Sequence, residues 1–165
     1  MSQLKDFYIR IPKKLIFISF VLALMVDFVP VSGSLHWLPD ITLLILIYWL
    51  ATCPQYINLG MAFVAGLLVD IGTNGLLGSH ALAYLLAAYP IIINHRQFGM
   101  QNYGFQAVLV FLAVSLAEVV LIMVGWLGVN KLPDWSVLAA PVLGAVLWLM
   151  INKLLTSVIH SQRFR

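Results

Sequence analysis

The chain has 165 residues, of which 62% are hydrophobic and 9% are charged, with a formal net charge of +3. A soluble domain of this size would carry about a quarter charged residues, so the composition excludes an ordinary soluble protein. We predict an integral membrane protein in which residues 1–165 form a single transmembrane domain. A net positive charge suggests a nucleic-acid partner for a soluble chain. In a membrane protein, the positions of the basic residues instead indicate which ends of the helices face the cytoplasm. We therefore expect no nucleic acid.

Apolar segments follow one another along the chain, and we expect each to form a transmembrane helix in an all-α fold. A helix needs about 20 residues to cross a hydrocarbon core of about 30 Å, so the middle three segments must borrow flanking residues or thin the bilayer. Five helices, or a re-entrant segment near residues 72–78, are the alternatives to six. The six segments are residues 15–31, 41–53, 58–71, 79–93, 105–129 and 135–159.

The first of these segments has some features of a secretory signal, because Lys13 and Lys14 precede its apolar run. Its length, the presence of Asp27 and the lack of a good cleavage site favour a transmembrane helix instead. If both termini are cytoplasmic, Lys131 is the only one of the nine basic residues on the outer side. The positive-inside rule therefore predicts an N-in/C-in topology, which requires an even number of spans.

Two acids stand at the ends of the second and third segments. Pro39 and Asp40 open the second segment, and we expect Asp40 to cap the first turn of that helix; binding of a partner is the alternative. Asp70 lies at the carboxyl end of its helix, where the helix dipole disfavours a carboxylate. We expect it to pair with His80 or with a basic residue of another protein, or else to be hydrated at the outer interface.

Small residues share a helix face with Asp70. Ala62 and Gly66 precede it at intervals of four, and small residues let another backbone approach closely. The following turn contains Gly78, after which Ser79 is placed to cap the next helix. Further small-residue pairs occur in later segments, and all of these faces are candidate docking surfaces. The further pairs are Ala83/Ala87, Ala113/Ala117 and Ala140/Gly144.

Asp27 and Glu118 are also acids within predicted membrane segments, where ionisable residues indicate function by default. Three such acids could mark a path for protons or cations, although nothing in the sequence brings them to one face. There is no catalytic set, no HExxH sequence and no cluster of cysteine or histidine ligands. We therefore expect no enzymatic activity, no cofactor and no metal.

A pattern within residues 38–90 is made by Pro39, Asp40, Tyr48, Trp49, Pro54, residues 60–70, Gly78 and His80. This pattern resembles the rod shape-determining MreD family. The resemblance implies a fold similar to the S component of energy-coupling-factor transporters, a location in the bacterial inner (cytoplasmic) membrane and no enzymatic activity. It also implies association with the bitopic protein MreC and, through it, with RodA, a class B penicillin-binding protein and MreB. Asp40 and Asp70 are the acids of the shared pattern.

Our leading hypothesis is a non-catalytic scaffold of the bacterial cell-elongation complex, whose small-residue faces dock the transmembrane helix of an MreC-like partner. A transporter subunit for an ion or small molecule, with Asp70 and Glu118 in a pocket, is the second hypothesis. An intramembrane enzyme is the third, and it would require two of Asp27, Asp70 and Glu118 to face each other.

Overall fold

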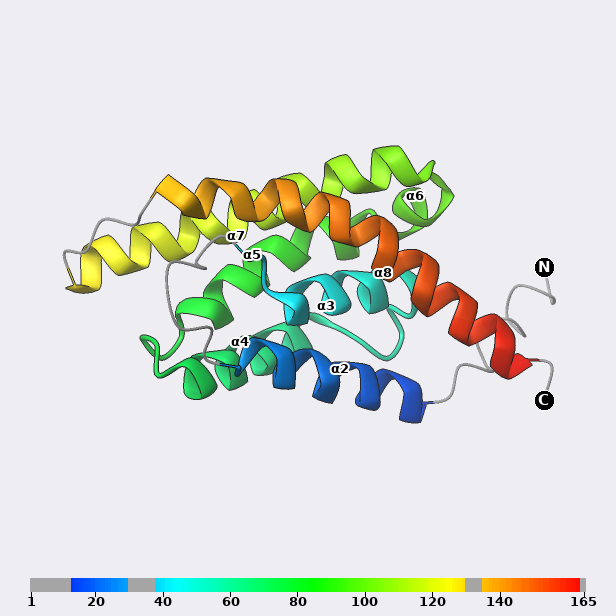
Figure 1. Ribbon diagram of the computed structural model, residues 1–165, viewed down its shortest axis with the longest axis horizontal. Coiled ribbons are helices and arrows are strands. Elements are labelled where there is room, and N and C mark those ends of the chain that lie inside the picture. The colour runs from blue at the N-terminus through cyan, green and yellow to red at the C-terminus, as the bar shows by residue number, and fades with distance from the viewer. Residues whose placement is uncertain (1–12, 30–37, 130–134, 164–165) are drawn as a thin grey trace.

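The computed structural model describes residues 13–29, 38–129 and 135–163 (Figure 1). Four of the nine basic residues that predict the N-in/C-in topology, Lys131 among them, lie outside these residues. The described part is helical throughout and contains no strand. Its elements are α2 (Lys13–Asp27), α3 (Ile41–Thr52), α4 (Leu59–Thr73), α5 (Ser79–Ile93), α6 (His95–Met100), α7 (Tyr103–Val129), the 3₁₀ helix η1 (Trp135–Ala139) and α8 (Ala140–Arg163).

Helices form where the apolar segments predict them, and α5 has the predicted bounds. The six longer helices run along the long axis of the bundle, and consecutive ones run in opposite directions (Figure 1). The start of α2, the end of α8 and the short helix α6 lie at one end, which we call the α6 end. The turn between α4 and α5 and the end of α7 lie at the opposite end, which we call the turn end.

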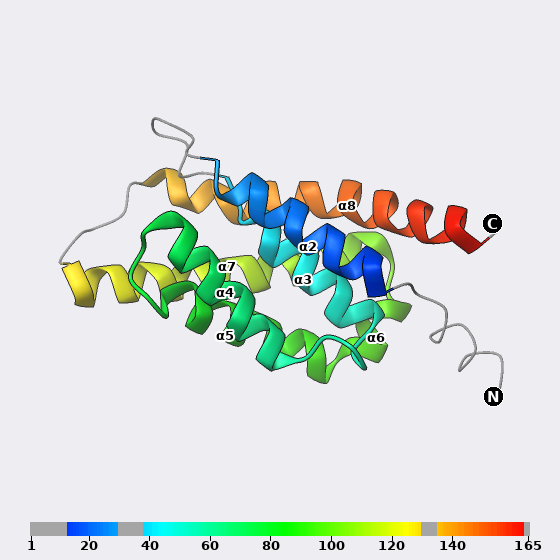
Figure 2. The ribbon, with the colours of Figure 1, turned by 90° about the horizontal axis from the view of Figure 1, so that it is seen from below.

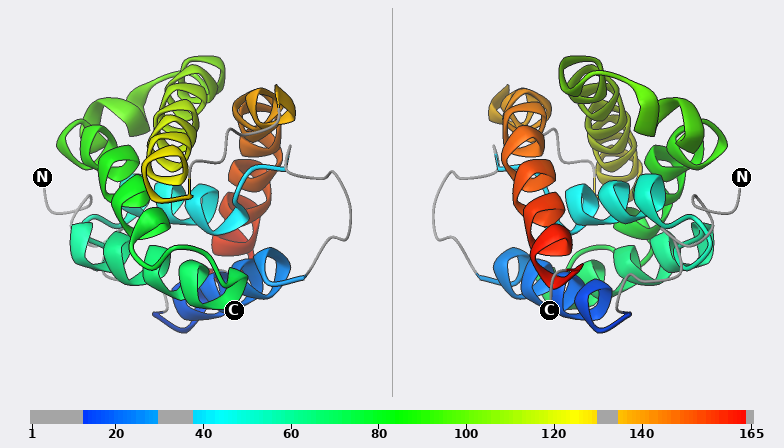
Figure 3. Two further views of the ribbon diagram at one scale, coloured as in Figure 1. Left: turned by 90° about the vertical axis from the view of Figure 1, so that its left-hand side faces the viewer. Right: turned by 90° about the vertical axis from the view of Figure 1, so that its right-hand side faces the viewer.

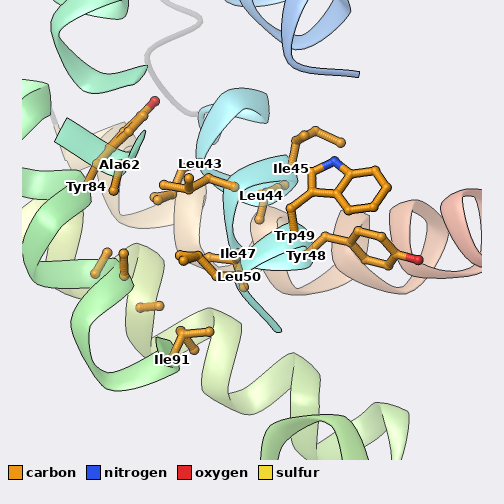
Figure 4. Close-up of a cluster of buried hydrophobic side chains, with 14 of the residues drawn as sticks. Leu43, Leu44, Ile45, Ile47, Tyr48, Trp49, Leu50, Ala62, Tyr84 and Ile91 are labelled. Carbon is orange, nitrogen blue, oxygen red and sulfur yellow. The ribbon is translucent and has the colours of Figure 1, made fainter. Parts of the chain in front are cut away.

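The central element is α3, which is apolar all round and contacts helices on several sides. Nine of its twelve residues are buried, as expected for a helix without a polar face. Leu43, Ile47 and Leu50 point to one side of α3, whereas Tyr48 and Trp49 point to the other (Figure 4). The helix ends at Thr52, with Cys53 as its C-cap directly before Pro54, one residue short of the predicted end.

The helices differ greatly in length. At 1.5 Å per residue, the 12 residues of α3 span only about 18 Å, whereas the 27 residues of α7 span about 40 Å. Within the part of the chain that the structure describes, two helices are long and apolar enough by themselves to cross a membrane, Tyr103–Gly128 and Val137–Ile159. The helices α3, α4 and α5 are shorter apolar helices, in agreement with the shortness of the middle segments in the sequence.

The closest helix pair is α4 with α5, which lie side by side (Figure 2). A Cβ atom at Gly66 would lie 2.5 Å from both the Cα and N atoms of Ala81, closer than side chains and backbone approach in real proteins. Ala62 is fully buried in the same contact region. Gly66 therefore allows the backbones of two helices of this chain to touch.

The expectation that small-residue faces dock a partner is therefore wrong for a partner that approaches from outside. Every small residue named for those faces is buried within the bundle, and a Cβ at Gly144 would contact Val114 of α7 at 3.3 Å. The small residues are buried in contacts between helices of this chain, so they are not available to a partner. The other buried members are Ala83 and Ala87 on α5, Ala113 and Ala117 on α7, and Ala140 on α8.

We predict that Gly66→Ala lowers the stability of the protein by about 1–3 kcal/mol, the usual cost of overpacking. The added methyl group would collide with backbone, which cannot move as a flexible side chain can. Gly125→Ala on α7 is the matched control, because a Cβ there has no atom within 4 Å. Thermal unfolding in a mild detergent measures the effect. Equal melting temperatures for the two variants would contradict the close approach of α4 and α5.

Candidate functional site

The buried carboxylate of Asp70 is the best-bonded polar group of the turn end. Its side chain is 1% exposed. Oδ2 accepts a hydrogen bond from the backbone N–H of Gly78 at 2.8 Å. Oδ1 accepts bonds from the hydroxyl of Ser79 at 2.8 Å and from the backbone N–H of His80 at 3.0 Å, and it lies 2.7 Å from Nδ1 of the His80 ring. The carboxylate is thus bonded on both oxygens.

Local backbone geometry brings the start of α5 to this carboxylate. Asn74 ends α4 in the left-handed conformation with φ 52°, and the backbone N–H of Gly75 bonds the Asp70 carbonyl at 3.1 Å. Gly78 precedes α5 with φ 95°, a conformation that favours glycine. The first N–H groups of a helix have no partner within the helix, and they favour a negative charge. Asp70 fills that position from the preceding helix.

Asp40 lies on the other side of His80. Its Oδ2 accepts a hydrogen bond from the Tyr84 hydroxyl at 3.0 Å and lies 3.9 Å from Nε2 of His80. The His80 ring therefore stands between Asp70 and Asp40, and it also meets the Tyr84 ring edge-on. The predicted contact between Asp70 and His80 is present. Whether either acid binds a partner stays a prediction.

The prediction that Asp40 caps α3 with its side chain is wrong. Asp40 occupies the position before the helix, but its carboxylate makes no capping bond and turns to Tyr84 instead. Asp27, at the end of α2, takes the capping role. It accepts bonds from the backbone N–H groups of Ile41 at 3.0 Å and Thr42 at 2.8 Å. Sequence reasoning missed this because the donor helix is 14 residues further along the chain.

These residues form one polar junction, which we call the acid junction: Asp27, Asp40, Asp70, His80 and Tyr84. It joins the end of α2, the start of α3, the end of α4 and the first two turns of α5. Most of its donors are backbone N–H groups that would otherwise lack partners. Among the residues the structure describes, no group of three or more potential ligands is arranged to hold a metal ion. The bonds of the junction hold helices together.

Glu118 lies apart from the junction, half-buried along α7. Within the described residues its carboxyl forms no hydrogen bond, although it interacts electrostatically with Asp40. No two carboxyl groups of the described chain are hydrogen-bonded to each other. Because paired catalytic carboxyls can lie several ångströms apart without a mutual hydrogen bond, the facing acids that an intramembrane enzyme would require stay a prediction.

A second polar network lies toward the α6 end, and the sequence analysis missed it. Asn152 of α8 donates to Oε1 of Gln106 at 2.8 Å, and Gln106 of α7 donates to the carbonyls of Phe98 and Gln101. Thr156 connects Asn152 to the hydroxyl of Tyr48 on α3, at 3.3 and 3.2 Å. Amide side chains inside otherwise apolar segments were the available signal, because such groups are buried only when bonded.

Comparisons with known proteins extend the resemblance beyond the 38–90 stretch. The family model of the rod shape-determining protein MreD matches residues 8–158. The curated rod shape-determining protein MreD of Haemophilus influenzae is 26% identical over 130 residues, which cover 78% of this chain and 80% of that relative. No solved structure gives a significant match. The matched residues include both polar networks, all the helices from α2 to α7, and most of α8.

We predict that Asp70→Asn destabilises the protein more than Asp40→Asn does. An amide at position 70 loses charge-assisted hydrogen bonds worth about 1.5–3 kcal/mol each and presents an NH₂ group to N–H donors. Asp40 receives one hydroxyl donor, so its amide variant should cost about 1 kcal/mol. Unfolding in detergent, followed by loss of helical circular dichroism, gives the ranking. An equal or reversed ranking would contradict the central place of Asp70 in the junction.

Proposed function

This chain belongs to the MreD family of rod shape-determining proteins, and we propose that it is a non-catalytic scaffold of the cell-elongation complex in the bacterial inner membrane. Family membership implies a role in determining rod shape. In the proposed role, the chain docks the single transmembrane helix of an MreC-like bitopic protein. Through that partner it is linked to RodA, a class B penicillin-binding protein and MreB.

One observation carries this proposal: the conspicuous acids are engaged in bonds that join helices. Asp27 and Asp70 accept bonds from the backbone at the starts of α3 and α5. A catalytic or transporting carboxylate needs free access to a substrate or ion, whereas these carboxylates are occupied by hydrogen bonds that hold neighbouring helices together. A scaffold requires this kind of rigidity, because it must present fixed helix faces to its neighbours.

An even number of crossings also fits the arrangement. The start of α2 and the end of α8 lie at the same end of the bundle (Figure 1). The exposed basic residues Lys13, Lys14, Arg96 and Lys153 lie toward that end. Basic residues favour the cytoplasmic side. We therefore propose that the α6 end faces the cytoplasm, with short helices α3 to α5 completing a six-span bundle.

The docking surface that we propose lies on α8. Val142, Val146, Met150 and Leu154 recur every four residues, are 55–67% exposed, and form what we call the α8 ridge. A row of side chains at i, i+4 and i+8 is the ridge that packs into the groove of another helix. The row extends for about 18 Å at 1.5 Å per residue. Since the small-residue faces are occupied internally, this ridge of larger side chains is the better candidate.

We predict that Val146→Trp on the α8 ridge lowers copurification of an MreC-like partner. Overpacking at a helix contact costs about 1–3 kcal/mol, or roughly a tenfold loss of complex. Val119→Trp on α7 is the matched control, since Val119 is 50% exposed and lies on a different helix. The measurement is partner recovered per scaffold chain from detergent-solubilised membranes. Equal recovery for both variants and the unmodified chain would refute docking through this ridge.

A transporter subunit is the second candidate, and Glu118 is the observation that favours it. This acid is half-buried on α7 and has no hydrogen bond within the described residues. The scaffold role predicts that Glu118→Gln leaves partner recovery unchanged and that liposomes containing the protein show no saturable uptake. Saturable uptake of a labelled solute that disappears in Glu118→Gln would favour transport instead.

A further inference from the structure

An open apolar groove lies between the end of α5, the short helix α6 and the first half of α7. Its volume is about 360 Å³. Leu109, Leu112 and Leu116 of α7 form one wall, and Phe98 of α6 lies in its floor, 2% exposed. Gln106 bonds the backbone carbonyls of Phe98 and Gln101, but no side chain that lines the groove takes part in either polar network. The groove therefore offers a binding surface that the proposed scaffold role does not use.

The proportions of the groove indicate what can fill it. Its lining on α7 extends from Phe105 to Leu116, which is about 16 Å of helix at 1.5 Å per residue. A volume of about 360 Å³ over that length gives a cross-section of roughly 20 Å². An α-helix with side chains is about 10 Å wide and has a cross-section of roughly 80 Å². The groove can enclose a single hydrocarbon chain, whereas a helix could insert only one row of its side chains.

The mouth of the groove is polar, and it lies at the α6 end. Asn94, Gln97 and Gln101 line it, and the side chains of Gln97 and Gln101 form no hydrogen bond within the described residues. Their NH₂ groups are donors that have no acceptor in the described part of the chain. Arg96 is exposed on the same short helix. Donors and a positive charge above an apolar slot match the phosphate and acyl chain of a phospholipid.

The distribution of charge supports an acidic headgroup. The charged residues toward the α6 end of the described chain are all basic: Lys13, Lys14, Arg96, Lys153 and Arg163. The described acids lie elsewhere: Asp27, Asp40 and Asp70 in the acid junction at the turn end, and Glu118 along α7. Basic residues near a membrane surface attract anionic lipids. The groove mouth thus faces the side of the bundle where a lipid phosphate is favoured.

We propose that this groove holds one acyl chain of a phospholipid from the leaflet at the α6 end. The chain lies along Leu109, Leu112 and Leu116, and the phosphate accepts hydrogen bonds from Gln97 and Gln101 beside Arg96. A lipid seated in this way would fill the space between α5 and α7 that no side chain of the described protein occupies. It would act as a structural part of the bundle rather than as a passing neighbour.

The test is lipid retention by the full chain, purified in mild detergent from membranes of phosphatidylglycerol and phosphatidylethanolamine and measured by native mass spectrometry. Leu112→Trp places an indole in the groove, and we expect it to lower the retained phospholipid by about tenfold or more, since burial of two methylene groups is worth about that factor. The control is Val119→Trp, since Val119 is 50% exposed against 56% for Leu112 and lies outside the groove, and this variant should retain one phospholipid per chain.

A second variant distinguishes the loss of headgroup binding from a loss of protein stability. Gln97→Ala with Gln101→Ala removes two exposed side chains that bond nothing in the described protein, and we expect it to lower retention without changing the melting temperature. Equal retention in the unmodified chain, Leu112→Trp and the double alanine variant would overturn the proposal. Loss of lipid in Val119→Trp as well would also overturn it, because the lipid would then be ordinary surrounding bilayer. Neither result refutes docking of a partner on the α8 ridge, which Val146→Trp tests separately.

Discussion

The constraint on which the rest of the bundle depends is the burial of the Asp70 carboxylate against the start of α5. A charged group in hydrocarbon is costly unless it is bonded, and the free N–H groups at a helix start are equally costly. The carboxylate of Asp70 accepts hydrogen bonds from the backbone N–H groups at the start of α5, so both groups are bonded. The turn from Asn74 to Gly78 must therefore reverse the chain so that α5 begins beside the end of α4. That reversal sets the close pairing of the two helices, which Gly66 then permits.

Two polar networks enclose the apolar core from opposite ends. The acid junction joins α2, α3, α4 and α5 at the turn end, and the network around Gln106 and Asn152 joins α3, α6, α7 and α8 toward the α6 end. Only α3 takes part in both, and it is the most completely buried helix. Helices in lipid gain little from the hydrophobic effect on packing together. Hydrogen bonds at both ends fix the orientation of the helices relative to one another, which apolar contacts alone would not do.

The sequence predicted the helices well because hydrophobic length and turn residues are local signals. It also predicted the contact between Asp70 and His80, since the turn between them is short. It failed for Asp40 and Asp27, because the choice between a capping bond and Tyr84 depends on how three helices meet. It failed for the small-residue faces for the same reason. A small residue indicates close approach of a backbone, but the sequence does not say whether that backbone belongs to this chain or to another.

The exposed surface left by this packing divides into two regions with different properties. The groove lies on the side of α7 that faces α5 and α6, and α8 lies on the other side of α7 (Figure 3). A narrow concave slot favours a flexible acyl chain, whereas the convex α8 ridge favours the groove of a rigid helix. Both sites can be filled at once because they do not share a residue. A lipid that steadies α7 against α5 would therefore help α8 present its ridge in a fixed orientation, and a fixed orientation reduces the entropy lost when a partner helix binds.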